Sequence, residues 1–314
     1  MRVLLLGGTD VTLVAADALM ESGQDIAAAV HLPEEFAISY RPAFHNSRHA
    51  DVAGWARSRG VPSVAYENPD QLLDVIRDES PEIGLAAGWY HMVPRRVRSG
   101  LPLGCLGLHA SLLPRLRGGA PLAWAILSGA TETGVSLFVL SDGVDDGPLY
   151  GQRSFPLGPR TRVNDLVGAA NTAVHELIIA CFPGIAARTL HPIPQRGEPS
   201  YGLQRSPDDG RIRWDRPASE IDRLVRASGP PYPGAFTYLE EERLTVLDVE
   251  PMSGVTVWGR PGQVARIDEC PDPCVVTGHG VVRVIECVDS RAEDARPLLL
   301  RSVHRGLDAI ERHK

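Results

Sequence analysis

The N-terminal part of the chain alternates short apolar runs of strand character with runs of helical spacing, and this alternation restricts the fold more than any other feature. The first apolar run, Val3 to Leu6, ends at Gly7-Gly8, after which Thr9 or Asp10 can cap a helix. Alternating strands and helices predict an α/β domain with a mostly parallel sheet covered on both faces. Ligands bind such sheets beyond the carboxyl ends of the strands. We expect strands at residues 3–6, 25–30, 62–66, 83–87 and 104–109, and helices at residues 11–20, 51–59, 69–78 and 163–180.

The C-terminal part of the chain has a different pattern. After a helical run at residues 218–227, short alternating runs are separated by Gly and Pro, which is typical of a small β-barrel or sandwich. Residues 188–209 are rich in Pro and lack periodicity, which indicates a linker. We therefore expect one domain over residues 1–190, a linker over residues 191–207 and a β-barrel-like domain over residues 208–314.

The composition is that of an ordinary globular protein, with 43% hydrophobic and 23% charged residues. The formal net charge of −7 argues against bulk binding of nucleic acid. The five cysteines are too few and too scattered for a disulfide framework and fit a reducing cytoplasm. We identify no apolar run of membrane length and expect no membrane partner.

Three other signals are weak. Gly7-Gly8-Thr9 lacks the third glycine of a dinucleotide fingerprint. Cys270 and Cys274 flank Pro-Asp-Pro, but a metal site would need two more ligands nearby, so we interpret them as loop cysteines and expect no metal. The arginines of the segment 95–98 are typical of a solvated helix face.

The segment from Gly107 to Pro121 carries the chemistry. His109 ends an expected strand, and Asp145 lies in a loop rich in Asp and Gly between two further expected strands. An imidazole beside a carboxylate can carry a proton or stabilise a developing oxyanion. From spacing alone, a packed structural histidine is an equally good interpretation.

A family resemblance is carried by His109-Ala110-Ser111-Leu112-Leu113-Pro114, followed by Arg117-Gly118. These residues resemble the formyltransferases that use 10-formyltetrahydrofolate, and residues 142–148 look like the second motif of that family. Motifs between residues 206 and 236 are similar to the C-terminal domain of methionyl-tRNA formyltransferases and amino-sugar formyltransferases. The resemblance implies a Rossmann-like catalytic domain, a small OB-like barrel after it, and 10-formyltetrahydrofolate as the formyl donor.

The resemblance also implies the catalytic residues. The family uses Asn-x-His and the second Asp of the later motif, and His109 and Asp145 match two of these three positions. The Asn position falls on Gly107, which has no side chain to donate a hydrogen bond to the formyl oxygen. Loss of one such donor typically costs roughly 100- to 1000-fold in rate.

Three interpretations of this departure stay open. The enzyme formylates with a water or a backbone N–H in place of the missing amide, or its pocket serves another folate-dependent reaction, or the chain binds ligands without catalysis. A folate- or nucleotide-binding regulator is the corresponding non-enzyme alternative. We favour the first interpretation because His109, Asp145 and the Ser-Leu-Leu-Pro loop are all kept.

The family binds the pterin ring in an apolar slot between two segments, and a flat ring with polar edges suits such a slot. By motif match, the residues expected to bind the folate are Trp89, Tyr90, His91, Met92, Val93, Ser111, Leu112, Leu113, Val139, Leu140, Ser141, Asp142 and Val144.

The acceptor is inferred from charge. A tRNA substrate requires local positive charge, yet the stretch Leu32 to Tyr40, which would face a tRNA, contains Glu34 and Glu35. Residues 200–314 hold more acidic than basic side chains. We therefore expect a small-molecule amine, such as a nucleotide-linked amino sugar or an amino-acid-like precursor, with methionyl-tRNA as an alternative. The sequence leaves open whether the chain forms a homo-oligomer.

Overall fold

The computed structural model describes residues 1–38, 41–268, 270–303 and 305–308. The chain divides into two compact units that are interleaved along the sequence. The first comprises Met1–Pro121, Thr131–Pro156 and Val167–Leu203, and the second Leu122–Ala130, Leu157–Leu166 and Gln204–Lys314. Two short segments that precede residue 190 in sequence therefore belong to the second unit.

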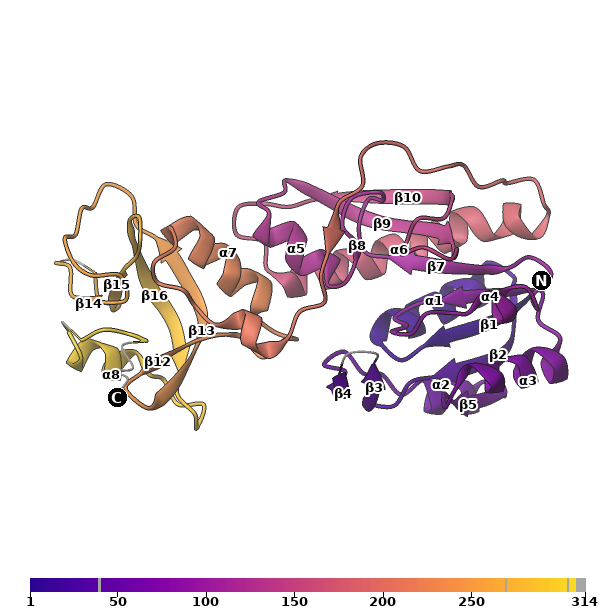
Figure 1. The fold of residues 1–314 in the computed structure, drawn as a ribbon, viewed down its shortest axis with the longest axis horizontal. Coiled ribbons are helices and arrows are strands. Elements are labelled where there is room, and N and C mark those ends of the chain that lie inside the picture. The colour runs from indigo at the N-terminus through magenta and orange to yellow at the C-terminus, as the bar shows by residue number, and fades with distance from the viewer. Residues whose placement is uncertain (39–40, 269, 304, 309–314) are drawn as a thin grey trace. The chain divides into compact units, whose positions relative to one another are not determined.

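The first unit is built on a seven-stranded sheet (Figure 1) with the strand order β10-β9-β7-β6-β1-β2-β5. Neighbouring strands from β7 to β5 run parallel, and β9 is antiparallel to both of its neighbours. The mostly parallel sheet predicted from the alternation is thus confirmed. Its strands are β1 (Arg2–Gly7), β2 (Asp25–His31), β5 (Ser63–Ala65), β6 (Ile83–Ala86), β7 (Cys105–His109), β9 (Glu132–Val139) and β10 (Leu149–Pro156).

The helices of this unit begin where the sequence supplies a cap. Asn68, for example, precedes α3 and its Oδ1 accepts hydrogen bonds from the backbone N–H groups of Asp70 and Gln71, while Pro69 takes the first helical position. The helices are α1 (Asp10–Glu21), α2 (Val52–Ser58), α3 (Pro69–Glu79), α4 (Arg95–Arg98) and most of α6 (Val163–Ala186). Two small strand pairs complete the unit: β3 (Glu35–Ile38) with β4 (Arg41–His45), and β8 (Arg117–Gly118) with β11 (Tyr201–Gly202).

Helix α6 corrects one expectation. No apolar run of membrane length was expected, but α6 is long and apolar enough to cross a membrane by length and composition alone. Half of its most apolar window is buried inside the protein. Leu177 and Cys181 approach Gly151 of β10 closely enough that a Cβ there would lie 3.1 and 3.0 Å from them. The apolar character of α6 is therefore that of a helix packed on the sheet.

The second unit contains an antiparallel sheet of order β12-β13-β16-β15-β14, as the predicted β-barrel-like domain requires. Trp214, Ile221 of α7 and Val246 of β13 are among its buried core residues. The elements are α5 (Pro121–Leu127, of which Pro121 belongs to the first unit), η1 (Pro207–Gly210), α7 (Ala218–Ser228), β12 (Ala235–Leu239), β13 (Glu242–Pro251), β14 (Val264–Ala265), β15 (Cys274–Val276), β16 (Val281–Val288) and α8 (Arg296–Arg301).

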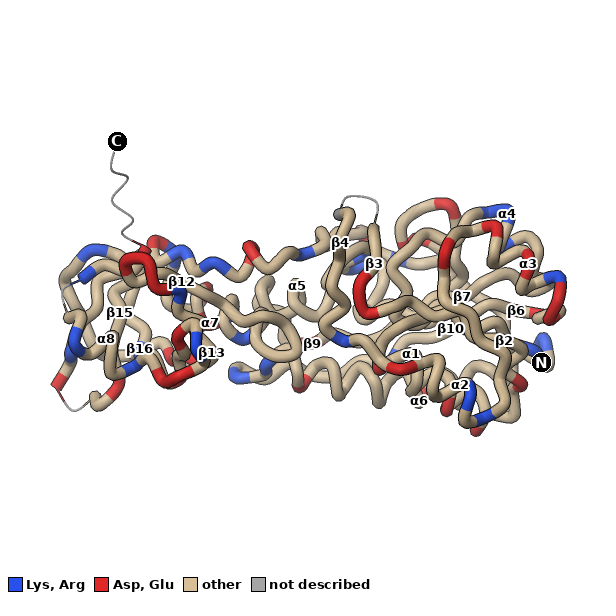
Figure 2. The backbone as a smooth tube through the Cα atoms, turned by 90° about the horizontal axis from the view of Figure 1, so that it is seen from below, with Lys and Arg blue, Asp and Glu red and all other residues tan. Residues whose placement is uncertain are grey.

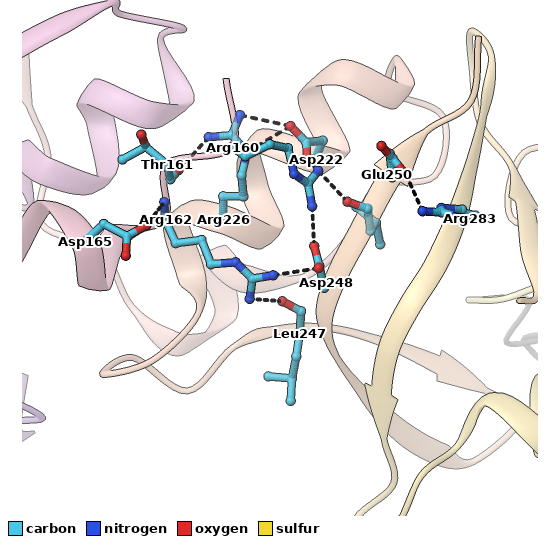
Figure 3. Close-up of polar contacts among 11 residues, drawn as sticks. Arg160, Thr161, Arg162, Asp165, Asp222, Arg226, Leu247, Asp248, Glu250 and Arg283 are labelled. Atoms are coloured by element: carbon cyan, nitrogen blue, oxygen red, sulfur yellow. Dashed lines mark hydrogen bonds and ion pairs between the residues drawn. The ribbon is translucent and has the colours of Figure 1, made fainter. Parts of the chain in front are cut away.

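An ion-pair network explains why residues 157–166 belong to the second unit (Figure 3). Arg160 donates to Asp222 of α7 at 2.9 Å and to Asp248 of β13 at 2.6 Å, and Arg162 reaches the other oxygen of Asp248 at 2.6 Å. Arg226 pairs with Asp222 at 2.9 Å, with both side chains 9% exposed. Asp222, Arg226 and Asp248 are largely withdrawn from water, so each depends on its partners. The more exposed Arg160 and Arg162 tie their segment to α7 and β13 through these two carboxylates.

Candidate active site

His109 is the last residue of β7, the strand between β6 and β9. Its side chain is 9% exposed, and its Nδ1 lies 3.4 Å from Oδ2 of Asp145. Its Nε2 lies 2.7 Å from the carbonyl oxygen of Leu116. The imidazole of His109 and the carboxylate of Asp145, the two groups that the motif match selects, therefore meet at the carboxyl end of β7.

The two ring nitrogens of His109 face different oxygens. A carbonyl oxygen can only accept, so the Nε2 that contacts Leu116 carries a proton. Nδ1 then faces Oδ2 of the Asp145 carboxylate. The ring is thus held between a backbone carbonyl on one side and a carboxylate on the other.

Asp145 adopts a left-handed backbone conformation with φ of 48°, which is uncommon for a residue with a side chain. Its Oδ2 accepts a 2.8 Å hydrogen bond from the backbone N–H of Gly118, and its carbonyl oxygen accepts one of 2.8 Å from Nε2 of Gln195. Its side chain is 22% exposed, and Oδ1 makes no hydrogen bond or ion pair within the described part of the chain. That oxygen is available to accept a proton.

The space beside Gly107 is filled with hydrocarbon. Gly107 lies opposite Phe138 in the β7–β9 register, and a Cβ added to it would lie 2.8 Å from Cε1 of Phe138 and 2.8 Å from Cδ2 of Leu140. Phe138 is 2% exposed. Two side chains thus occupy this position, where a water or a backbone N–H was expected to replace the missing amide.

The Ser-Leu-Leu-Pro loop is anchored on β9 and β10. Ser136 of β9 donates to the carbonyl oxygen of Ser111 at 2.6 Å and accepts from the N–H of Leu113 at 3.1 Å. Gln152 of β10 donates to the carbonyl oxygen of Leu113 at 3.0 Å. Leu112 also turns toward β9, since a Cβ on Gly134 would lie 2.5 Å from its Cδ2. These contacts hold the loop that follows His109.

The two segments expected to enclose the pterin are linked by Arg98. Its guanidinium donates to the carbonyl oxygens of Val93 at 3.0 Å and Leu140 at 2.9 Å, and it pairs with the carboxylate of Asp142. The side chains of Val93 and Leu140 pack in one apolar cluster. Arg98 is 14% exposed, so the interpretation of this arginine as part of a solvated helix face is wrong.

The aromatic residues of the first segment pack with one another. The ring centroids of Trp89 and His91 lie 4.8 and 4.9 Å from that of Tyr66, and the ring centroid of Tyr90 lies 5.0 Å from that of Phe44. Burial lowers the pKa of His91, which favours its neutral ring. Nε1 of Trp89 is buried and has no hydrogen-bond partner in the described part of the chain.

This arrangement fits a flat ring with polar edges. Apolar side chains, an unpartnered indole N–H and backbone groups lie on the two segments, and Met92 and Val144 are 61% and 49% exposed. The remaining positions expected to bind folate, Val139 and Ser141, flank Leu140 at the end of β9, where Ser141 contacts the carboxylate of Asp146.

Cys270 and Cys274 lie close together, but the described residues place no third His, Cys, Asp or Glu side chain with them to bind a metal ion. Sγ of Cys274 lies 3.8 Å from Sγ of Cys270 and 3.6 Å from Sδ of Met252. Within the described ranges, no group of three or more His, Cys, Asp or Glu side chains is placed to hold a metal ion.

Comparison with known proteins now decides the family. Residues 15–182 match the formyl transferase family model, and residues 205–298 match the model of the formyl transferase C-terminal domain. The chain belongs to the formyl transferase family. It is 31% identical over 293 residues to the methionyl-tRNA formyltransferase of Chloroflexus aurantiacus, covering 91% of each chain. It is 32% identical over 305 residues to that of Anaeromyxobacter dehalogenans, covering 95% of each chain.

Solved structures agree on the fold. HypX from Aquifex aeolicus in complex with tetrahydrofolic acid has a TM-score of 0.66 at 20% identity, over 96% of this chain and 48% of that one. The N-formyltransferase of Helicobacter canadensis, in complex with folinic acid and dTDP-3-aminofucose, has a TM-score of 0.64 at 14% identity, over 90% of this chain and 98% of that one. At these identities the likeness concerns the fold, which is a Rossmann-like domain followed by a C-terminal half-barrel.

Membership of the family confirms the expected enzyme class and donor. Formyltransferases transfer formyl groups, and the donor of the family is 10-formyltetrahydrofolate. Three residues around the candidate site were not predicted from the sequence: Arg98, Phe138 and Gln195. Arg98 and Gln195 bind carbonyl groups more than forty residues away in sequence, those of Leu140 and Asp145, and Phe138 has the sequence pattern of an ordinary strand residue.

Proposed function

We propose that this formyltransferase transfers the formyl group of 10-formyltetrahydrofolate to the amine of a small molecule, with a nucleotide-linked amino sugar or an amino-acid-like precursor as the preferred acceptor. The observation that carries the proposal is the His109–Asp145 pair at the end of β7, with one carboxylate oxygen free to accept a proton. Such a pair serves acyl transfer to an amine, where a proton leaves the nucleophile while negative charge develops on oxygen.

The roles of the two residues follow from their surroundings. The bound donor supplies the formyl carbon, and the acceptor nitrogen takes it as the bond to the folate nitrogen breaks. The departing folate nitrogen gains one proton, equal to the one that the acceptor amine loses, so that tetrahydrofolate leaves neutral at that nitrogen. Oδ1 of Asp145 accepts a proton from the acceptor amine, since Oδ2 already binds Gly118. His109 supplies an N–H to the formyl oxygen, which requires Nε2 to exchange its bond to Leu116 for one to the substrate.

Charge supports a small acceptor. In the described part of the second unit, acidic and basic residues are interspersed along the chain (Figure 2), without the continuous basic stretch that binding to tRNA phosphates favours. In the first unit, Glu34 and the start of β3 at Glu35 carry negative charge on the stretch that would face a tRNA. Residues 39 and 40 of that stretch lie outside the described residues.

Methionyl-tRNA is the second candidate acceptor. One observation favours it: several relatives that align with about nine tenths or more of the chain are methionyl-tRNA formyltransferases by name. The choice between the two acceptors rests on charge on one side and sequence similarity on the other.

The deciding experiment offers both acceptors to the purified enzyme. Release of tetrahydrofolate is followed by ultraviolet absorbance with a panel of nucleotide amino sugars and diamino acids, and in parallel with charged initiator tRNA. We expect formylation of a small amine and none of the tRNA. Formylation of the tRNA alone would assign the second candidate.

Two variants test the site itself. We expect His109→Gln and Asp145→Asn each to lower kcat by about 100-fold or more while folate still binds. The matched control is His175→Gln, because His175 forms a surface pair with Glu21 at 2.8 Å and lies on α6. Parental behaviour of His109→Gln in every assay would contradict the proposal and favour a ligand-binding protein without catalysis.

A further inference from the structure

We propose that Gln195 is a positioning residue that holds the carboxylate of Asp145 in its working orientation; this rests on the proposed function of Asp145. The residue lies in the proline-rich stretch that the sequence predicts as a linker. From residue 193 to residue 200, Gln195 is the one residue that is not exposed. Its side chain turns inward from a segment that otherwise faces solvent.

The hydrogen bonds of Gln195 use both ends of its amide. Nε2 donates to the carbonyl oxygens of Asp145 and Gly147, each at 2.8 Å. Oε1 accepts from Nη2 of Arg117 at 2.6 Å and from its Nε at 3.2 Å. Carbonyls only accept and a guanidinium only donates, so the partners themselves determine which end of the amide is which.

These bonds join the two backbone segments on which the Asp145 carboxylate depends. One segment is the loop that carries Asp145. The other is β8, where Arg117 is followed by Gly118, whose N–H binds Oδ2 of Asp145. Gln195 therefore links the backbone that presents the carboxylate to the strand that orients it.

The conformation of Asp145 explains why such a link is needed. Its left-handed φ of 48° is disfavoured for a residue with a side chain, so the surroundings must hold it. Gln195 binds the carbonyl groups of Asp145 and Gly147, which stand on either side of Asp146. Without these bonds the loop can relax and the carboxylate can leave both His109 and Gly118.

The substitution Gln195→Glu distinguishes two roles for Gln195: holding the loop of Asp145, as proposed, or only binding the guanidinium of Arg117. Gln195→Glu keeps the length of the side chain and an oxygen that pairs with Arg117, but it replaces the N–H donors with an oxygen facing two carbonyls. Gln195→Met keeps the length and loses both sets of bonds. If Gln195 serves only to bind Arg117, the glutamate variant behaves like the parent.

We expect both variants to lower kcat by about 10- to 100-fold with KM for the folate donor changed less than about twofold, because a small misplacement of a catalytic group costs rate more than binding. The matched control is Gln71→Glu, since Nε2 of Gln71 also donates to a backbone carbonyl, that of Ala65, at 2.8 Å on the exposed face of α3. Thermal unfolding of all three variants checks that each is folded.

Hydrogen exchange supplies a readout that does not depend on activity. The amide of Gly118 is protected by its bond to Asp145, and we expect this protection to fall in Gln195→Glu and Gln195→Met but not in Gln71→Glu. Parental kcat together with parental protection of Gly118 in both Gln195 variants would overturn the inference. Absence of transfer by the parent to every acceptor would instead refute the proposed function, and Gly118 exchange would still test Gln195.

Discussion

Replacement of Gly107 by asparagine is the most informative perturbation of the candidate site. It supplies the asparagine that the family resemblance implies for this position, so the motif alone predicts transfer that is raised or at least not abolished. The structure predicts a different result, because the new side chain enters space occupied by Phe138 and Leu140. The substitution thus separates the effect of the missing donor from the effect of packing.

The magnitudes can be worked from the contacts. A Cβ at residue 107 would lie 2.8 Å from both neighbours, and the carboxamide must fit beyond it. Overpacking of this kind costs about 1–3 kcal/mol, and an unpartnered buried amide costs about 1–3 kcal/mol more. A correctly aimed donor to the formyl oxygen is worth roughly 100- to 1000-fold in kcat. We therefore expect Gly107→Asn alone to lose stability and gain little rate.

Removing the ring of Phe138 relieves one of the two close contacts, while that with Cδ2 of Leu140 remains. In the double variant Gly107→Asn/Phe138→Leu, we expect stability to recover by at least about 1 kcal/mol relative to the sum of the single variants, because the two side chains compete for one space. We also expect kcat to rise above that of Phe138→Leu alone.

The assay is a double-mutant cycle with two readouts, urea unfolding for stability and release of tetrahydrofolate for rate. Gly107→Ala serves as the control that adds Cβ without the amide. Additive stabilities, with Gly107→Asn as stable as the parent, would show that Phe138 does not occupy this space and would refute the packing argument.

Three further predictions follow from buried groups. Asp222→Ala leaves Arg226 buried without its partner, so we expect urea unfolding of the second unit to show a loss of about 3–5 kcal/mol, and a loss under 1 kcal/mol would contradict the network. Arg98→Met removes the link between the two segments expected to bind the folate, so we expect fluorescence titration to show folate binding weakened by about tenfold or more, and an unchanged Kd would count against that link. Burial raises the pKa of the Cys105 thiol to about 12, which keeps it protonated at neutral and mildly alkaline pH; mass spectrometry after thiol alkylation should find Cys270 modified and Cys105 intact, whereas equal labelling would contradict this.

Much of the first unit could be predicted from local pattern. The apolar run 3–6, the cap expected at Thr9 or Asp10 and the helical spacing of residues 69–78 lead to β1, α1 and α3 nearly as the structure has them. Periodicity reports which residues face a core, and that information is local. The motif around His109 likewise indicated the chemistry, because the residue types and their spacing carry it.

Other elements escaped prediction for physical reasons. Helix α6 was expected to end at residue 180 but continues to Ala186 with Pro183 inside it. The pair β3–β4 was not predicted, since Glu35 to His45 lacks clean alternation and the two strands are stabilised by pairing with each other. In both cases tertiary contacts outweighed the local preference.

The sequence by itself determined the alternation of the main strands and helices of the first unit, the change of pattern after residue 209, and the position of His109 at the end of a strand. The tertiary structure decided which groups surround the site. Register between β7 and β9 places Phe138 beside Gly107, and Gln195 reaches Asp145 from a segment fifty residues away along the chain. Such contacts depend on how distant segments pack and hydrogen-bond, and local patterns of hydrophobicity carry no record of them.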